Sequence, residues 1–591
     1  MATISPCTRL ALLLLLPHFL TLSLAAEDDL VIDTRHGKVQ GKLLSVLGGD
    51  VRAFLGIPYG KPPLGKLRFR APQPVERWEG VRDATRYSNS CYQVPDTNFP
   101  GFKGEEMWNP NTPLSEDCLY LNVWSPRINK TQPQPMPLAP VLVWIYGGGF
   151  YSGTSSLDVY DGRFLSKSEG VVVVSMNYRL GALGFLSIPD NKNIQSNVGL
   201  RDQRFALQWV ADNIAAFGGD PTKVTLFGES AGSASVGYQL LSPGSQRLFQ
   251  RAVMQSGSPN AYWAGVSQTE IWSRSMKLVT LLGCPTSPPS DMEACLLQAN
   301  PKTITSKQND VAPLTLTPFV PHVDGDFLPD KVEVLLSSGT LLKKDVMFGL
   351  NKDEGTPFLL YGYPGFSLTG QSLITRHEFV NGVELALVHL SDVSRDAAIF
   401  HYTDWTDEND KMKNRDLLGR LVGDHMFYCP VLDFAHRYVQ RGGPAYLYFF
   451  DHRSSVNPWP EWMGAMHGYE IEFVFGMPLN ASLGYTKNEV NMTKKFMKHW
   501  ANFARTGNPG IDGANWPLFT PERQEYVTLN YNQPEQKRML RAEENHLWNT
   551  LIPKLQKVSD DLLSCVTGNG LTLHCNYTLL LLLLLVITLT Y

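Results

Sequence analysis

The chain has 591 residues, 43% hydrophobic and 18% charged, which supplies a large core and excludes a mainly disordered protein. A formal net charge of −4 provides no basic surface, so we expect no nucleic-acid partner. Because no repeat or Pro/Ser-rich linker divides the middle of the chain, we expect one large domain over residues 27–556.

The N-terminus has the features of a secretory signal peptide. Arg9 precedes a leucine-rich stretch, and Ser23 and Ala25 are small residues at the spacing of a signal-peptidase site. We therefore expect residues 1–26 to be removed and the mature protein to be extracellular. N-glycosylation sequons that agree with export lie at Asn129, Asn480 and Asn491.

Apolar runs alternate with helical patterns through the middle of the chain. The runs read as buried strands at residues 141–146, 171–176, 224–227, 252–255, 346–350 and 445–450. Helical periodicity is clearest over residues 200–217 and 490–505. This alternation predicts an α/β fold with a large central, mostly parallel sheet flanked by helices, and reactive groups beyond the carboxyl ends of strands.

The segment TLFGESAGSA nominates Ser230 as a nucleophile, because it fits Gly-x-Ser-x-Gly between a β-rich run and a helix-forming run. A sharp strand-to-helix turn exposes the serine and aims the following amide at a developing oxyanion. By itself the pentapeptide fits an ordinary turn equally well. Upstream, an apolar strand ends in a glycine run, and we expect oxyanion donors at Gly148, Gly149 and Ala231.

A serine nucleophile needs a histidine base and an acid, in the chain order Ser, acid, His that this turn usually brings. His467, in MHGYEIEF, is favoured over His425 because its loop turns into a predicted helix. Glu354, which follows a predicted strand in NKDEG, is the favoured acid. Asp353 and Asp424 are its alternatives, and any one of these carboxylates is more often a solvated charge.

The eight cysteines of an exported chain raise the question of disulfides. Cys7 and Cys575 leave with the terminal signals. Short loops favour the pairs Cys91–Cys118 and Cys284–Cys295, each worth roughly 2–4 kcal/mol. Cys429 and Cys565 then remain.

The C-terminal run LLLLLLLVITLTY is short for a membrane-spanning helix and lacks a basic flank. Small residues, a spacer and this run match the signal for a glycosylphosphatidylinositol anchor. We expect attachment at Gly568, with Ser564 as the alternative, and removal of residues 569–591. The competing interpretation is a marginal membrane helix.

The chain resembles the cholinesterases, a branch of the carboxylesterase family with the α/β-hydrolase fold. The resemblance runs from about Asp33 to Leu555 and rests on FLGIPYGKPPLGKLRF, EDCLYLNVW, VWIYGGGFYSG, NVGLRDQRFALQWV, FGESAG, NKDEG and HGYEIEFVFG. It implies Ser230 as nucleophile, His467 as general base and then acid, and Glu354 as its orienting partner. It implies no metal and no cofactor.

Further residues acquire roles only through this resemblance. Trp108 matches the tryptophan that holds a quaternary ammonium by cation–π attraction, although a lone tryptophan is usually packing. Glu229 and Tyr160 match residues on the choline side. Asp96, Tyr151 and Tyr361 resemble residues at the gorge mouth and peripheral site.

On the acyl side the chain departs from the acetyl-selective pattern, because Thr315 and Thr317 stand where two phenylalanines are expected. A slipped register would put Leu314 or Leu316 there instead. Trp263 and Phe358 still match acyl-side walls. We therefore expect hydrolysis of butyryl- or propionylcholine as well as acetylcholine.

Asn545 occupies the position of the family's third disulfide partner, so Cys429 either stays reduced or pairs with Cys565. We favour Cys565 as the interchain bridge of a homodimer, in a stalk over residues 557–568 that precedes a lipid anchor. The resemblance thus predicts a cell-surface serine hydrolase that terminates or scavenges cholinergic esters. The alternatives are a general carboxylesterase of broad specificity and a non-catalytic adhesion protein.

Overall fold

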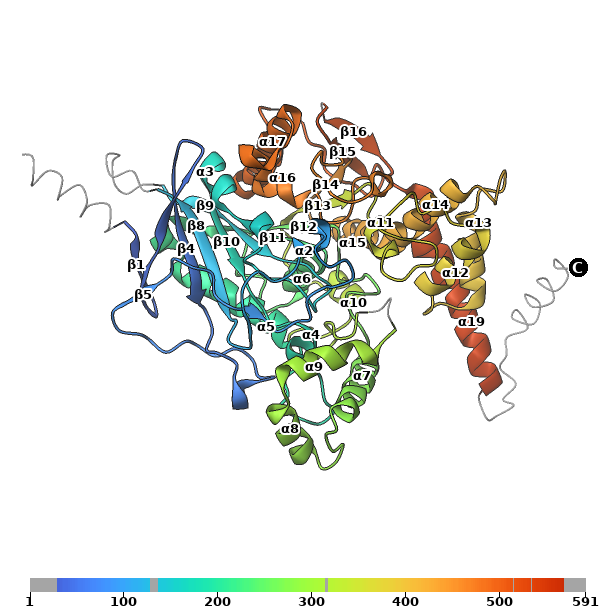
Figure 1. The fold of residues 1–591 in the computed structure, drawn as a ribbon, viewed down its shortest axis with the longest axis horizontal. Helices are drawn as coiled ribbons and strands as arrows, with labels where there is room; N and C mark the ends of the chain where they lie inside the picture. The colour runs from blue at the N-terminus through green and yellow to red at the C-terminus, as the bar shows by residue number, and fades with distance from the viewer. Residues whose placement is uncertain (1–28, 128–136, 314–316, 514, 533, 568–591) are drawn as a thin grey trace, which may run out of the picture.

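A twisted sheet forms the centre of the protein in the computed structural model, which describes residues 29–127, 137–313, 317–513, 515–532 and 534–567 (Figure 1). The strands of the sheet follow one another in space as β16 (Glu535–Arg538), β15 (Glu525–Leu529), β14 (Ala445–Phe450), β13 (Asp345–Asn351), β12 (Arg251–Gln255), β11 (Gly219–Glu229), β9 (Ala139–Ile145), β10 (Val172–Met176), β8 (Tyr120–Pro126), β4 (Gly49–Pro58) and β3 (Lys42–Val46). Neighbours from β15 to β10 pair in parallel, and the outer pairs are antiparallel. The expected mostly parallel sheet is confirmed.

In the described part of the chain, two smaller sheets, of three and of two strands, accompany this sheet. They are β1 (Val31–Thr34), β2 (Gly37–Gln40) and β5 (Val81–Asp83) in one group, and β6 (Ser90–Cys91) with β7 (Leu114–Ser115) in another.

Helices cover both faces of the sheet because the central strands are apolar on both sides. On one face α5 (Val198–Asn213) and α6 (Ala231–Leu241) pack, and on the other α3 (Arg163–Glu169) and α17 (Lys487–Thr506) pack (Figure 1). Trp144 of β9 lies 4.8 Å from Phe227 of β11 between ring centroids. Full burial of each such ring contributes roughly 3 kcal/mol.

The remaining helices lie beyond the carboxyl ends of the strands or on the periphery. They are α2 (Lys103–Glu106), α4 (Gly181–Phe185), α7 (Gln268–Leu281), α8 (Pro289–Gln298), α9 (Pro301–Lys307), α10 (Val332–Ser337), α11 (Thr356–Leu359), α12 (Arg376–Ala386), α13 (Asp392–His401), α14 (Lys411–Gly423), α15 (Cys429–Gln440), α16 (Ile471–Phe475), α18 (Ala542–His546) and α19 (Ile552–Thr567). Two π-helical turns, η5 (Asp424–Tyr428) and η9 (Leu547–Leu551), interrupt this group.

The last helix is continuous across the predicted boundary between the large domain and the stalk. Helix α19 runs from Ile552 to Thr567 and packs on α13, at the end of the molecule that also holds α12 and α14 (Figure 1). The boundary at residues 556 and 557 therefore falls inside a helix. Of the helices that the structure describes, none combines the length and the apolar character that a bilayer crossing needs.

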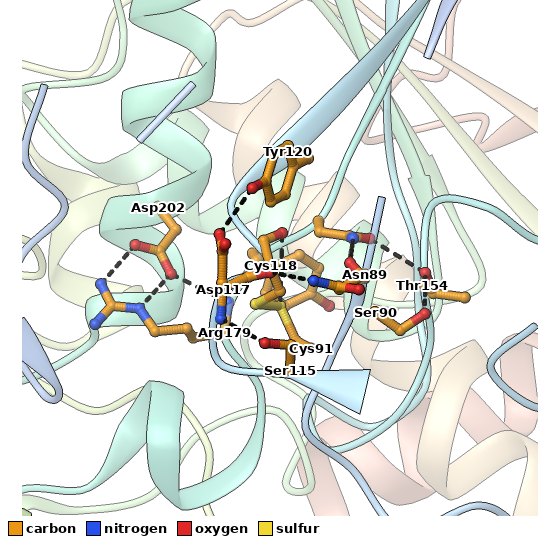
Figure 2. Close-up of a disulfide and its surroundings, with 12 residues drawn as sticks. Asn89, Ser90, Cys91, Ser115, Asp117, Cys118, Tyr120, Thr154, Arg179 and Asp202 are labelled. Carbon is orange, nitrogen blue, oxygen red and sulfur yellow. Dashed lines mark hydrogen bonds and ion pairs between the residues drawn. A yellow bond between two sulfur atoms is a disulfide. The ribbon is translucent and has the colours of Figure 1, made fainter. Parts of the chain in front are cut away.

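Both expected short-loop disulfides are present. Cys91 bonds Cys118 across 27 residues, and Cys284 bonds Cys295 across 11 residues. Around the first bond, Asn89 donates to the Asp117 carbonyl at 3.1 Å and Tyr120 donates to the Asp117 carboxylate at 2.8 Å (Figure 2). This bond closes the loop that carries Asp96 and Trp108.

Cys429 is buried and has no disulfide partner among the described residues. The side chain of Cys565 lies outside them, so the choice between a reduced Cys429 and a bond to Cys565 stays a prediction. Several predicted sites lie outside the described residues: the signal peptide, Asn129, Thr315, the side chain of Cys565, Gly568 and the C-terminal run.

Candidate active site

Ser230 occupies the turn between β11 and α6, at the carboxyl end of the strand. Its backbone has φ 58° and ψ −126°, a strained conformation for a residue with a side chain. Gly232 makes the turn possible, because a Cβ there would lie 2.0 Å from the carbonyl oxygen of Ile145 in β9. Strain at a strand-to-helix turn is typical of a serine nucleophile.

A carboxylate orients His467 beside this turn. His467 Nδ1 lies 2.7 Å from Glu354 Oε2, although the two residues are 113 positions apart in the chain. The other oxygen of Glu354 accepts hydrogen bonds from the Asn351 amide at 2.7 Å and the Ser256 hydroxyl at 2.5 Å. These bonds fix the Glu354 carboxylate and, through it, the plane of the imidazole.

The alternative acids and the alternative base have other partners. Asp353 accepts from the Ala465 amide at 2.8 Å, and Asp424 accepts from the Tyr402 hydroxyl at 2.9 Å and pairs with Arg541. His425 stacks against Trp548 with ring centroids 4.3 Å apart. The structure therefore places Glu354 against His467 and leaves these three residues elsewhere.

Glu229, directly before the serine, faces the second nitrogen of the imidazole. His467 Nε2 lies 3.0 Å from Glu229 Oε1. Burial lowers the pKa of His467, but the negative charges of Glu229 and Glu354 outweigh it and raise this pKa to about 9. Burial also raises the pKa of Glu229, to about 8, against the opposing charge of His467. The two groups interact directly, so they titrate as a coupled pair.

Within the described structure the Ser230 hydroxyl makes no hydrogen bond to His467. Catalytic hydrogen bonds are often loose without substrate and tighten when it binds. A hydrogen bond between the Ser230 hydroxyl and Nε2 would require a rotation of the serine or of the imidazole away from Glu229.

Glu470 is a third buried carboxylate here, and the sequence interpretation missed it. It accepts hydrogen bonds from Asn351 Nδ2 at 2.6 Å and Gln255 Nε2 at 2.9 Å, and its burial raises its pKa. Its position in HGYEIEF, three residues after His467, was the available signal. Glu470 supports the same strand end that supports Glu354.

The glycine run after β9 presents backbone amides without protein partners. Gly148 has φ 103° and Gly149 has φ 58°, and a Cβ on Gly149 would lie 2.5 Å from the Tyr151 ring. Among the described groups none accepts a hydrogen bond from the Gly148 or Gly149 amide. The Ala231 amide, at the first position of α6, has no acceptor within its own helix. Such amides are suited to an oxyanion.

Trp108 and Glu229 flank the same glycine on the other side of the site. A Cβ on Gly468 would lie 3.5 Å from both the Trp108 ring and Glu229 Oε1. Trp108 packs against Tyr469 with ring centroids 6.0 Å apart. Tyr160 is buried, and burial followed by the charge of Glu229 raises its pKa. An aromatic face beside a carboxylate suits a small organic cation.

Aromatic rings and Thr317 lie on the remaining side of the candidate site. The Phe358 and Phe427 rings lie 5.4 Å and 4.2 Å from the His467 ring. Phe427 was missed because it belongs to the π-helical turn η5, which sequence patterns do not signal. Thr317 donates to the Trp263 carbonyl at 2.6 Å, and its methyl group faces Gly149.

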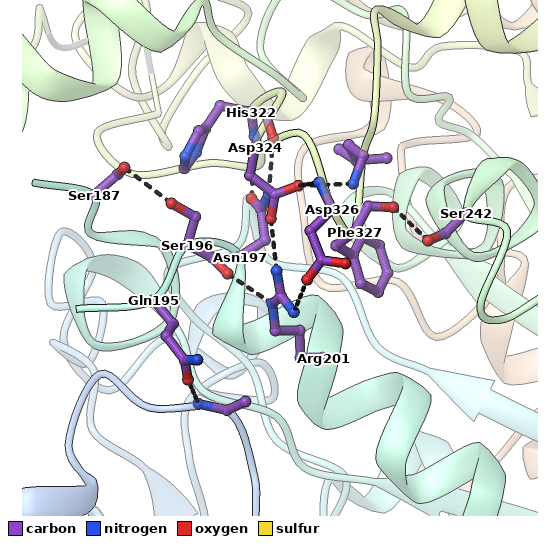
Figure 3. Close-up of polar contacts among 12 residues, drawn as sticks. Ser187, Gln195, Ser196, Asn197, Arg201, Ser242, His322, Asp324, Asp326 and Phe327 are labelled. Atoms are coloured by element: carbon purple, nitrogen blue, oxygen red, sulfur yellow. Dashed lines mark hydrogen bonds and ion pairs between the residues drawn. The ribbon is translucent and has the colours of Figure 1, made fainter. Parts of the chain in front are cut away.

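The chain after Thr317 is anchored on both sides. Arg274 donates to the Thr317 carbonyl at 2.7 Å, and His322 and Asn197 exchange two hydrogen bonds, at 2.8 and 3.1 Å. Arg201 then pairs with Asp324 at 2.9 Å (Figure 3). These contacts hold the segment that carries Thr317 against the body of the protein.

The residues predicted for the gorge mouth and the peripheral site lie near Asp96. Burial, followed by the charge of Asp96, raises the pKa of Tyr361 and of Tyr151. Phe99, which the sequence interpretation did not single out, packs against Tyr361 with ring centroids 5.9 Å apart. Tyr151 is 39% exposed, so this cluster reaches the surface.

Comparison with known proteins agrees with this geometry. The profile of the Carboxylesterase family matches residues 28–548. A protein named acetylcholinesterase from Bungarus fasciatus is 50% identical over 560 residues, which cover 94% of this chain and 91% of the relative. A protein named cholinesterase from Mus musculus is 49% identical over 542 residues, which cover 91% of this chain and 89% of the relative.

Proposed function

Because the chain belongs to the carboxylesterase family, it is a carboxylic ester hydrolase, and we propose that it cleaves choline esters through an acyl-enzyme on Ser230. One observation carries the assignment of residues. His467 is held at 2.7 Å by a buried Glu354, beside a serine in a strained strand-to-helix turn. The two relatives, named acetylcholinesterase and cholinesterase, support choline esters as substrates.

In the first half of the reaction, Ser230 Oγ attacks the ester carbonyl carbon while His467 Nε2 takes the hydroxyl proton. The carbonyl oxygen becomes an oxyanion, which the amides of Gly148, Gly149 and Ala231 stabilise. The C–O bond to choline then breaks, and the imidazolium returns the proton to the leaving alcohol. In the second half water repeats these steps and releases the acid.

The charge of the substrate assists this chemistry. We assign the ammonium group to the space between Trp108 and Glu229, where cation–π attraction contributes about 2 kcal/mol when water is excluded. A cation there repels the imidazolium and lowers the pKa of His467. Binding of the substrate thus favours the neutral base that acylation requires.

The acyl-enzyme can be detected directly. Rapid mixing with butyrylcholine, followed by acid quench and mass spectrometry of the peptide that contains Ser230, should show a butyryl adduct. Ser230→Ala should show neither adduct nor turnover above background, while circular dichroism should be unchanged. An adduct on another residue, or full turnover by Ser230→Ala, would contradict the assignment.

A homodimer is supported by the surface of α13 and α19. Phe400 of α13 is 68% exposed, Val393 is 47% exposed, and Val558 of α19 is 38% exposed. Helices α13 and α19 contact each other, and exposed apolar side chains on neighbouring helices are typical of an interface. We assign Cys565 to an interchain disulfide, and replacement with serine should convert a dimer into monomers on a non-reducing gel.

Attachment by a glycosylphosphatidylinositol lipid at Gly568 would hold this dimer at the outer cell surface. The composition of the C-terminal run supports this proposal. Phosphatidylinositol-specific phospholipase should release activity from intact cells that express the full chain. Activity that remains with the cells would favour a membrane helix instead.

A further inference from the structure

A pair of histidines that the proposed reaction does not use lies against Tyr262, the residue before Trp263. His389 follows α12, and His425 belongs to η5. Their Nε2 atoms lie 3.2 Å apart, and their ring planes differ by 12°. His389 reaches the surface, so small solutes have access to the pair.

Two aromatic rings fix this arrangement. The Tyr262 ring lies 4.5 Å from His389 and 4.4 Å from His425, and the two histidine centroids are 5.2 Å apart. Both imidazoles therefore lie on one face of Tyr262, edge to edge. Trp548 stacks on His425 at 4.3 Å and is not within stacking distance of Tyr262, so it covers the opposite face of His425.

The contact between the two rings indicates that at least one of them is neutral. A hydrogen bond between two Nε2 atoms at 3.2 Å needs one nitrogen that accepts, and an imidazolium has none. Metal ligands must be deprotonated, and neutral imidazole is the form of histidine that coordinates a cation.

We propose that the Nε2 atoms of His389 and His425 together bind one divalent transition-metal ion of the Zn²⁺, Cu²⁺ or Ni²⁺ class. Two nitrogens bound at about 2.05 Å to a tetrahedral Zn²⁺ lie roughly 3.3 Å apart, close to the observed separation. In the free pair one Nε2 carries a hydrogen and donates it to the other. On binding, that imidazole moves its proton to Nδ1 through solvent, and no net proton is released.

Water completes the coordination sphere. Within the described residues no group of three or more His, Cys, Asp or Glu side chains is suited to a metal, so the site has two protein ligands. Such a site is exchangeable rather than structural. Affinity should follow Cu²⁺ above Ni²⁺ and Zn²⁺, with no binding of Mg²⁺, which prefers oxygen ligands.

The position of the pair connects it to the acyl side. Tyr262 precedes Trp263, whose indole donates to the Met426 carbonyl at 2.8 Å, and η5 also carries Phe427 against His467. A cation held by His389 and His425 is attached to η5 through His425. We therefore expect that binding of Zn²⁺ changes the turnover of butyrylcholine.

Trp548 provides a reporter of binding that is independent of turnover. Cu²⁺ quenches the fluorescence of an adjacent indole, and with 13 tryptophans in the chain the expected loss is partial and saturable. His389→Gln and Trp548→Phe should each remove this loss. His377→Gln is the control, because His377 lies in α12, the helix that precedes His389, and its ring contacts Asn381 at 3.1 Å, so this variant should leave the loss unchanged.

Electron paramagnetic resonance of the protein with one equivalent of Cu²⁺ should show coupling to two nitrogens in the parent and to at most one in His389→Gln. An unchanged spectrum and unchanged quenching in His389→Gln would overturn the site. For turnover, butyrylcholine hydrolysis is followed by acid release, because thiol products bind copper and zinc. Equal turnover of the parent with and without saturating Zn²⁺ would overturn the connection to η5.

Discussion

Glu229 is the residue whose charge acts most directly on His467, the proposed general base. Replacement by glutamine keeps the shape and removes the anion 3.0 Å from His467 Nε2. The pKa of His467, raised to about 9, should fall toward its ordinary value near 6.5.

The proposed reaction requires neutral His467, so activity should be lost as the pH falls through this pKa. In Glu229→Gln the acid limb of the kcat profile should therefore move to lower pH. An uncharged ester provides the cleanest measurement, since its binding does not depend on the lost carboxylate. An acid limb that moves to higher pH, or does not move, would contradict the assigned interaction.

A substitution at Gly149 tests the proposed oxyanion donors. Gly149→Ala introduces a Cβ 2.5 Å from the Tyr151 ring at a backbone with φ 58°, so the amide must move. Loss of one donor costs about 3 kcal/mol, and kcat should fall by roughly 10²-fold or more. The Tyr151→Ala background removes the clash and serves as control. Recovery of activity there would show that the clash acts by displacing the amide. An unchanged kcat in Gly149→Ala alone would contradict the assignment of this donor.

At the level of elements, the strands were the most predictable part of the chain. Each predicted central run matches a strand within a few residues, because apolar runs buried on both faces have few alternatives. The turns η5 and η9 were not predicted, since π-helical geometry depends on packing and not on local pattern. Phe427 was missed for this reason. Glu470 lies within a recognised motif, but a motif gives spacing along the chain and not the direction in which each side chain points.

The loop closed by Cys91 and Cys118 gives a prediction about substrate binding. Replacement of both cysteines by serine should lower the free energy of unfolding by roughly 3 kcal/mol. Because this loop carries Trp108 and Asp96, KM for choline esters should rise while kcat for an uncharged ester is retained. KM and kcat are measured for both substrates well below the unfolding temperature.

The pair Cys284 and Cys295 is the matched control, since its loop spans only 11 residues. Its removal should destabilise the protein less and leave KM for both substrates unchanged. Equal effects of the two double replacements on KM would mean that the first loop does not position the choline side.

For the whole molecule, the exposed face of α13 and α19 determines the expected assembly. Phe400→Asp places a charge on a side chain that is 68% exposed in the single chain. It should leave folding and turnover per subunit intact and convert dimers into monomers in sedimentation velocity runs under reducing conditions. Arg395→Asp, also on α13, controls for a general effect of charge. Persistent dimers in Phe400→Asp would exclude this face.

The proposed function requires that the site selects esters for their positive charge. The most direct measurement compares kcat/KM for acetylcholine and for the uncharged ester in which carbon replaces the ammonium nitrogen, in the parent and in Trp108→Ala. A cation–π contribution of about 2 kcal/mol predicts a preference of roughly 30-fold for the charged ester in the parent, and a much smaller one in Trp108→Ala. Equal values for the two esters in the parent would contradict the account and indicate a general carboxylesterase.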